Sequence, residues 1–142
     1  MYLLQIEDNR GDVMLVHQAV EEIDTHVELQ VVEDGQAALD FLRQCEVDPP
    51  LRCPDVILLD LNLPSKHGAD VLAELKQHPR LKGIPVVVFT GADDPHTVEH
   101  CYALGANAFL RKPMDIDEYF ALIRTCVEFW HACQVPRLPP VP

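Results

Sequence analysis

The sequence predicts an α/β fold in which a parallel sheet of five strands is covered by helices on both faces. Five short apolar segments recur along the 142 residues, and amphipathic helical patterns separate them. The run Val56–Leu59 contains apolar residues without alternation, which is typical of a strand buried on both faces. Strands that alternate with helices favour a parallel, doubly wound sheet with right-handed crossovers. The expected element order is therefore (βα)5.

The elements can be assigned in chain order from their apolar patterns. In the first expected helix Val13, Val16 and Val20 follow helical spacing, and Asp12 is the predicted N-cap. A later helix is expected to end before Gly105, and the last one to begin near Asp115. The expected strands cover 3–6, 27–32, 55–59, 85–89 and 108–110. The intervening helices are expected to start after residue 12, after 35, after 68 and at 95.

The final predicted helix carries two apolar stripes. The first is expected to face the core and consists of Ile116, Phe120, Ile123, Val127 and Trp130. The second consists of Tyr119, Leu122, Cys126 and Phe129 and continues to Cys133. One helix packed on a sheet needs only one such stripe. The second stripe therefore predicts the interface of a homodimer, with partial cover by another helix as the alternative.

Composition and charge exclude several classes of function. The chain is 48% hydrophobic, is 24% charged and has a formal net charge of −12, which disfavours binding to nucleic acid or to an anionic membrane surface. No signal peptide or membrane span is recognisable, so a cytoplasmic protein is expected. The five cysteines form no C-x-x-C pair and are expected to be reduced thiols. We expect one domain, 1–132, a proline-rich tail, 133–142, and no attached output domain.

Polar residues follow the expected strands at one edge of the sheet. They are Glu7 and Asp8 after the first strand, Asp60 after the third, Thr90 after the fourth and Lys112 after the fifth. In a sheet of order 2-1-3-4-5 the first and third strands are neighbours, which would bring Asp8 beside Asp60. Clustered carboxylates repel unless a cation lies among them, and oxygen ligands favour Mg²⁺. A lysine and a hydroxyl aimed at the same place suit a phosphoryl group.

This combination, ED at 7 and 8, D at 60, T at 90 and KP at 112 and 113, resembles the receiver domain of two-component response regulators, which has a flavodoxin-like fold. The resemblance covers roughly residues 2–130. It implies a phosphoprotein of signal transduction rather than a conventional enzyme, capable only of Mg²⁺-dependent self-phosphorylation and slow self-dephosphorylation. The roles that it implies are Asp60 as phospho-acceptor, Glu7, Asp8, Asp60 and the Asn62 carbonyl as Mg²⁺ ligands, Lys112 as partner of the phosphoryl group, Thr90 and Phe109 as switch residues, and a cis peptide at Lys112-Pro113.

More particular features indicate a subgroup and its partners. The start EDN followed by Asp12, the segment ANAFLRKP and a last helix that contains FW resemble the stand-alone regulators paired with phytochrome-type histidine kinases. The resemblance implies that a sensor histidine kinase donates the phosphoryl group. It also implies that the output is a contact with a downstream protein or onward phosphotransfer, as in a phosphorelay.

Three alternatives compete with this interpretation. A haloacid-dehalogenase-like phosphatase also uses a strand-end aspartate, but it needs a second aspartate two residues later, where this chain has Asn62. A flavodoxin-type electron carrier would need a Ser/Thr/Gly-rich phosphate loop after the first strand. A zinc site is the third alternative, since His96 and His100 are spaced i, i+4 beside Cys101, but no further ligand follows at a fixed spacing.

Overall fold

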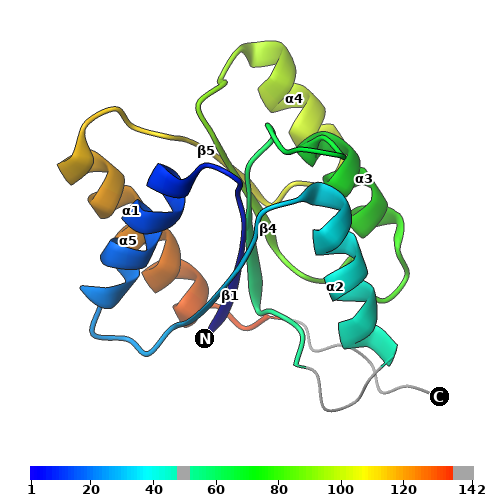
Figure 1. Ribbon diagram of the computed structural model, residues 1–142, viewed down its shortest axis with the longest axis horizontal. Helices are drawn as coiled ribbons and strands as arrows, with labels where there is room; N and C mark the ends of the chain where they lie inside the picture. Colours follow the sequence, from blue (N-terminus) through cyan, green and yellow to red (C-terminus); the bar gives the residue numbers. More distant parts are fainter. Residues whose placement is uncertain (48–51, 136–142) are drawn as a thin grey trace.

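The computed structural model describes residues 1–47 and 52–135, which form a three-layer α/β fold (Figure 1). Within these residues five parallel strands lie in the order β2-β1-β3-β4-β5, and a helix follows each strand. The predicted fold class and strand order are therefore confirmed. The elements are β1 (Tyr2–Ile6), α1 (Arg10–Glu21), β2 (Glu28–Val32), α2 (Gly35–Val47), β3 (Val56–Leu59), α3 (Gly68–Gln77), β4 (Val86–Thr90), α4 (Pro95–Ala103), β5 (Ala108–Arg111) and α5 (Ile116–Ala132).

The helices divide between the two faces of the sheet. Helices α1 and α5 lie side by side on one face, and α2, α3 and α4 cover the other (Figure 1). Side chains alternate along each strand, so Leu3 and Leu58 pack under α1 and α5, whereas Leu4 and Ile57 pack under the other three helices. Every residue of β3 and β4 is buried. This two-sided burial explains the unbroken apolar run in β3.

Helix α1 begins earlier than the sequence predicted. Its N-cap is Asn9, whose side chain accepts a hydrogen bond from the backbone N–H of Asp12 at 3.0 Å. The prediction of Asp12 as N-cap is therefore wrong. Asn9 satisfies one of the free N–H groups at the helix start, and the Asp12 carboxylate in the first turn is available for other contacts.

Helix α5 faces the core with most of the predicted stripe, but Tyr119 takes the place expected for Ile116. Tyr119, Ile123 and Val127 are buried, whereas Ile116 is 56% exposed. The Tyr119 ring packs edge-on against Phe89 of β4, with 5.2 Å between the ring centroids. Such an edge-to-face arrangement is favourable and places the tyrosine in the interior. Tyr119 was predicted to lie in a dimer interface, and the structure contradicts this.

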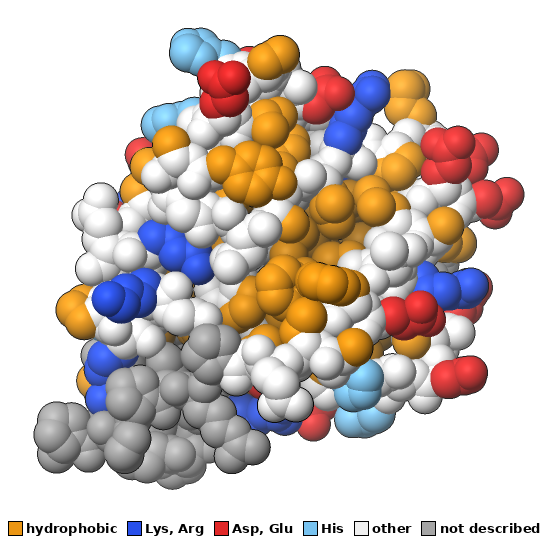
Figure 2. Space-filling model, turned by 180° about the vertical axis from the view of Figure 1, so that it is seen from behind, with side chains coloured by type: hydrophobic (Ala, Val, Ile, Leu, Met, Phe, Trp, Pro, Cys, Tyr) orange, Lys and Arg blue, Asp and Glu red, His pale blue; other side chains and the backbone are white. Residues whose placement is uncertain are grey.

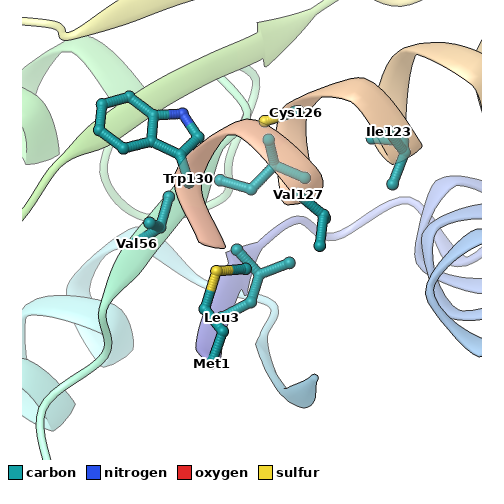
Figure 3. Close-up of a pocket in the computed structure, with 8 residues that line it drawn as sticks. Met1, Leu3, Val56, Ile123, Cys126, Val127 and Trp130 are labelled. Atoms are coloured by element: carbon teal, nitrogen blue, oxygen red, sulfur yellow. The ribbon is translucent and has the colours of Figure 1, made fainter. Parts of the chain in front are cut away.

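The last turns of α5 cover the starts of β1 and β3. Figure 3 shows the Trp130 side chain beside Val56, and these residues line a narrow apolar cavity together with Met1 and Cys126. Cys126 is therefore only partly available to a partner protein. Burial also raises the pKa of its thiol to about 11.

Two further predictions concern the ends of the chain and membranes. Residues 136–142 of the predicted tail lie outside the described residues, so the domain division at 132/133 stays a prediction. In the described ranges, no helix combines the length and the apolar character needed to cross a membrane.

Candidate functional site

The backbone brings the predicted site residues to one edge of the sheet. Hydrogen bonds between neighbouring strands continue past the strand ends. The N–H of Asp60 donates to the carbonyl of Ile6 at 3.0 Å, and the N–H of Lys112 donates to the carbonyl of Thr90 at 2.8 Å. Because these strands are parallel, the residues that follow them lie at the same, carboxyl edge.

Three acidic side chains converge at this edge. Carboxylate oxygens of Glu7, Asp8 and Asp60 all lie within 4.8 Å of one another. Glu7 is 2% exposed and Asp60 is 6% exposed, whereas Asp8 faces solvent. A set of oxygen ligands without sulfur or imidazole fits a hard divalent cation such as Mg²⁺. The acidic pocket is therefore a candidate site for a divalent metal.

Glu7 is the most perturbed of the three carboxylates. Burial raises its pKa to about 7, and the charge of Asp60 adds to this increase, although the hydrogen bond from Lys112 opposes it. The cause is that a charged carboxylate loses water on burial and meets a like charge nearby. A divalent cation in the pocket would favour the ionised form of Glu7.

Lys112 supplies the positive charge of the site. Its Nζ donates to Glu7 Oε2 at 2.8 Å and to Asp12 Oδ2 at 3.0 Å, and it lies 3.7 Å from Asp60 Oδ2. Burial alone would lower the pKa of Lys112, but the hydrogen bonds and charges of these carboxylates outweigh burial and raise it. Lys112 therefore stays protonated, and one of its three N–H donors remains for a further acceptor.

The side of the site that carries Asp60 is held by a close approach of α3 to the end of β3. A Cβ atom on Gly68 would lie only 2.2 Å from the carbonyl oxygen of Asp60, so this position requires glycine. The Gly68 N–H also donates to the carbonyl of Leu61 at 2.8 Å. Asp60 Oδ1 accepts from the Leu61 N–H at 2.9 Å, which leaves Oδ2 directed toward Lys112. Asn62 is exposed in the following loop, and its carbonyl stays a predicted metal ligand.

Thr90 and Phe109 lie on the strands next to the acidic pocket. Thr90 is fully buried, and its hydroxyl has no hydrogen-bond partner among the described residues. A buried hydroxyl without a hydrogen-bond partner is unfavourable. A hydrogen bond from Thr90 to a new acceptor nearby would therefore be stabilising. Phe109 is half-buried against the core under α2, α3 and α4, and its N–H donates to the Tyr102 hydroxyl at 3.0 Å.

One expectation about the site is wrong. The resemblance implied a cis peptide at Lys112-Pro113, but no cis peptide bond occurs in residues 1–47 and 52–135. The trans form is favoured by about 0.5–1 kcal/mol even before proline. In this trans arrangement the Lys112 side chain already reaches the acidic pocket.

Sequence reasoning missed Asp12 as part of the site. Its carboxylate is bound by Lys112 and also accepts a hydrogen bond from the Tyr119 hydroxyl at 2.8 Å. The available signal was its place in the first turn of a helix that begins directly after the strand-end carboxylates Glu7 and Asp8. Nothing in the local pattern could identify Tyr119, which comes 107 residues later in the chain.

The alternative zinc site is not supported. Cys101 is fully buried in the core, whereas His96 and His100 are exposed on α4. In the part of the chain that the structure describes, only one group of three or more His, Cys, Asp or Glu residues is close enough to share a metal ion. It consists of Glu7, Asp8 and Asp60.

Comparison with known proteins agrees with this geometry. Residues 3–124 match the family described as response regulator receiver domain. Response regulator Rcp1 from a Synechocystis strain is 39% identical over 128 residues, which cover 90% of this chain and 87% of Rcp1. The crystal structure of the Mn(2+)-bound form of Rcp1 aligns with a TM-score of 0.88 and 37% identity, and the match covers 96% of this chain and 99% of Rcp1.

A second solved structure is similarly close. The phosphorylated cyanobacterial phytochrome response regulator RcpA aligns with a TM-score of 0.89 and 36% identity over 96% of this chain and 98% of RcpA. The family match spans most of the 142 residues, and the site has the charges that phosphoryl transfer requires. The chain therefore belongs to the response regulator receiver family, whose members are phosphorylated by a histidine kinase and are not conventional enzymes.

Proposed function

We propose that Asp60 is the phospho-acceptor of this receiver. The observation that supports this most strongly is the position of Asp60 Oδ2, which lies 3.7 Å from Lys112 Nζ and within the acidic pocket. A metal ion in the pocket would be held by Glu7, Asp8 and Asp60, with the Asn62 carbonyl as a further ligand. It would offset negative charge on the group being transferred.

The proposed reaction moves one phosphoryl group. A carboxylate oxygen of Asp60 attacks phosphorus, a P–O bond forms, and the bond from phosphorus to the histidine nitrogen of the kinase breaks. The nitrogen lone pair returns to the imidazole, which takes up a proton from solvent. Lys112 stabilises the charge on the phosphoryl oxygens, since its Nζ has a donor that neither Glu7 nor Asp12 uses.

Thr90 and Phe109 form the proposed switch. The Thr90 hydroxyl lacks an acceptor among the described residues, and phosphoryl oxygens on Asp60 would provide one. Movement of Thr90 would leave space on the side of the sheet where Phe109 packs, and Phe109 could follow inward. The change would then reach α4 and β5, where a downstream protein or phosphotransfer partner could bind.

The phosphoryl donor is proposed to be a phytochrome-type histidine kinase. Support comes from the similarity to RcpA, which is described as a cyanobacterial phytochrome response regulator. A cytoplasmic location, where such a kinase would present its phosphohistidine, stays a prediction from the sequence.

Acetyl phosphate tests the acceptor directly. With Mg²⁺, the wild-type protein should gain one phosphoryl group by intact-mass measurement. Asp60→Asn should gain none, because an amide is a poor nucleophile. Asp117→Asn is the matched control, since it makes the same change on an exposed residue of α5. Full labelling of Asp60→Asn would assign the acceptor role elsewhere.

A homodimer is also proposed, on narrower grounds than the sequence suggested. Figure 2 shows hydrophobic side chains gathered on the face formed by α4, β5 and α5. Tyr119 is buried and Cys126 is partly covered, but Leu122 is half-buried and Phe129 is 58% exposed. An exposed apolar patch of this kind is typical of a protein contact.

Sedimentation tests this assembly. The wild-type protein should sediment as a dimer at micromolar concentration, and Leu122→Arg with Phe129→Asp should give a folded monomer that still labels at Asp60. A wild-type monomer both with and without beryllofluoride would exclude the dimer.

A further inference from the structure

Lys112 is shared between the acceptor and a carboxylate that lies outside the metal cluster. Its Nζ is 3.0 Å from Asp12 Oδ2 but 3.7 Å from Asp60 Oδ2, which is beyond a hydrogen bond. The Lys112 side chain is 14% exposed and that of Asp12 is 18% exposed, so the pair is shielded from solvent. Asp12, together with Glu7 Oε2 at 2.8 Å, therefore holds the lysine in a position from which it does not yet hydrogen-bond Asp60.

Asp12 also connects the site to α5. Its other carboxylate oxygen, Oδ1, accepts from the Tyr119 hydroxyl at 2.8 Å. Burial raises the pKa of Tyr119, and the hydrogen bond to Asp12 adds to the increase, so the phenol stays protonated and acts as donor. The Tyr119 ring is fixed by Phe89, whose ring centroid also lies 5.8 Å from Lys112 Nζ. A continuous chain of contacts thus runs from Asp60 through Lys112 and Asp12 to α5.

A phosphoryl group on Asp60 would compete with Asp12 for the lysine. Hydrogen bonds to charged acceptors strengthen with the charge on the acceptor. A phosphoryl group brings added negative charge and three oxygen acceptors to the side of Asp60 that faces Lys112. Movement of Nζ toward them lengthens its bond to Asp12, and the Asp12 carboxylate then depends more on the Tyr119 hydroxyl.

We propose that Asp12 and Tyr119 are positioning residues that couple the phosphorylation site to α5, separately from Thr90 and Phe109. Asp12 restrains Lys112 before phosphorylation, and the weakening of that restraint changes the Asp12–Tyr119 hydrogen bond and shifts α5 against α1. The inference rests on the proposed acceptor role of Asp60. The two helices already pack directly on one another, which makes such a shift transmissible.

The first test measures the restraint on Lys112. Asp12→Asn removes the charge but keeps the shape, so Lys112 should turn more readily to a group on Asp60. The affinity for beryllofluoride in the presence of Mg²⁺ should rise about three- to tenfold, which corresponds to the loss of one competing hydrogen bond. Asp117→Asn, the control for net charge, should stay within about twofold of wild type on the same scale.

The second test follows the coupling to α5 and does not depend on affinity. The ¹³Cζ shift of Tyr119, which reports on its hydroxyl, should change when beryllofluoride binds to the wild-type protein. Tyr119→Phe keeps the ring against Phe89 and removes only the hydroxyl. It should weaken beryllofluoride binding by no more than about threefold, because Asp12 then has Lys112 as its remaining donor, yet lose half or more of the amide shift changes across 116–132. The changes at Thr90 and Phe109 should remain.

The outcomes separate this inference from the proposed function. A wild-type protein that takes no phosphoryl group at Asp60 would refute the proposed function. Normal labelling together with equal affinities in Asp12→Asn and Asp117→Asn, or a full response of α5 in Tyr119→Phe, would refute the coupling. Urea unfolding of each variant shows whether it is folded, and Tyr119→Phe tests the coupling even if Asp12→Asn proves unstable.

Discussion

Two partly buried lysines at opposite edges of the sheet show how the same side chain serves different purposes. Lys112, at the carboxyl edge, is surrounded by the carboxylates of Glu7, Asp12 and Asp60. Lys76, on α3, reaches the amino edge. There its Nζ donates to three uncharged oxygens, which are the carbonyls of Lys82 and Ile84 and the side chain of Asn107.

The difference in partners reverses the pKa shift. Burial lowers the pKa of Lys76, because hydrogen bonds to uncharged oxygens do not replace the hydration energy that the charged ammonium loses on burial. The pKa of Lys112 is raised despite burial, because its carboxylate partners favour the charged form. Lys76 therefore connects two loops permanently, whereas Lys112 can exchange one anionic partner for another. Only the second arrangement suits a reversible modification.

The largest difference should appear when each lysine loses its charge. Lys112→Met leaves three carboxylates without a cation, so we expect a loss of about 3 kcal/mol in the free energy of unfolding. Labelling by acetyl phosphate should slow by about 10²-fold, because a charge aimed at the phosphoryl oxygens is gone. Urea unfolding and intact mass measure both effects, and Mg²⁺ should recover part of the stability. Lys82→Met is the control, and equal labelling rates in the two variants would contradict the assignment.

The carboxyl edge should also be the pH-sensitive one. The pKa of Glu7 in the folded state, about 7, exceeds the ordinary value of 4.5 for a glutamate, so the folded state binds more protons between these values. Wild-type stability should therefore fall as pH rises through this window. The glutamine of Glu7→Gln does not titrate. Without Mg²⁺, the free energy of unfolding of this variant should therefore rise by about 2–3 kcal/mol relative to that of the wild type between pH 5 and pH 8. A constant difference in urea midpoints across this range would show that Glu7 titrates normally.

Lys76→Met should affect stability alone. Three oxygens lose their donor, and we expect a loss of about 2 kcal/mol in the free energy of unfolding. Since none of its partners titrates, the difference from wild type should be constant between pH 5 and pH 8. Labelling at Asp60 should stay within about twofold of wild type. Slower labelling would mean that the amino edge also serves the phosphorylation site.

The smallest effect is expected from giving Lys76 a charged partner. Asn107→Asp keeps an oxygen for Lys76 and for the Val86 N–H, which donates to the same atom at 2.9 Å. Residue 107 is exposed, so stability should change by less than about 0.5 kcal/mol. The pKa of Lys76, followed by NMR of its Nζ, should nevertheless rise above the wild-type value. No rise would show that the partner's charge does not explain the contrast with Lys112.

Much of the fold and of the candidate site was predictable from local patterns. The unbroken apolar run of β3 predicted a central strand, and the alternation of strands and helices predicted a parallel sheet. In a parallel sheet the carboxyl ends of all strands lie at the same edge. The proximity of Asp8, Asp60 and Lys112 could therefore be predicted from the sequence. The convergence of Glu7, Asp8 and Asp60 follows from this topology.

Only the tertiary structure decided which face of α5 turns inward and which residues extend the site. Helical periodicity shows which side chains share a stripe, but the rotation of a helix depends on everything it packs against. Because α5 contacts α1 as well as the sheet, Tyr119 is buried and Ile116 is exposed, the reverse of the expectation. The hydrogen bond from the Tyr119 hydroxyl to Asp12 joins residues 107 positions apart, so no local sequence pattern could predict it. It exists because two helices on one face of a twisted sheet bring their first turns together beside the strand ends.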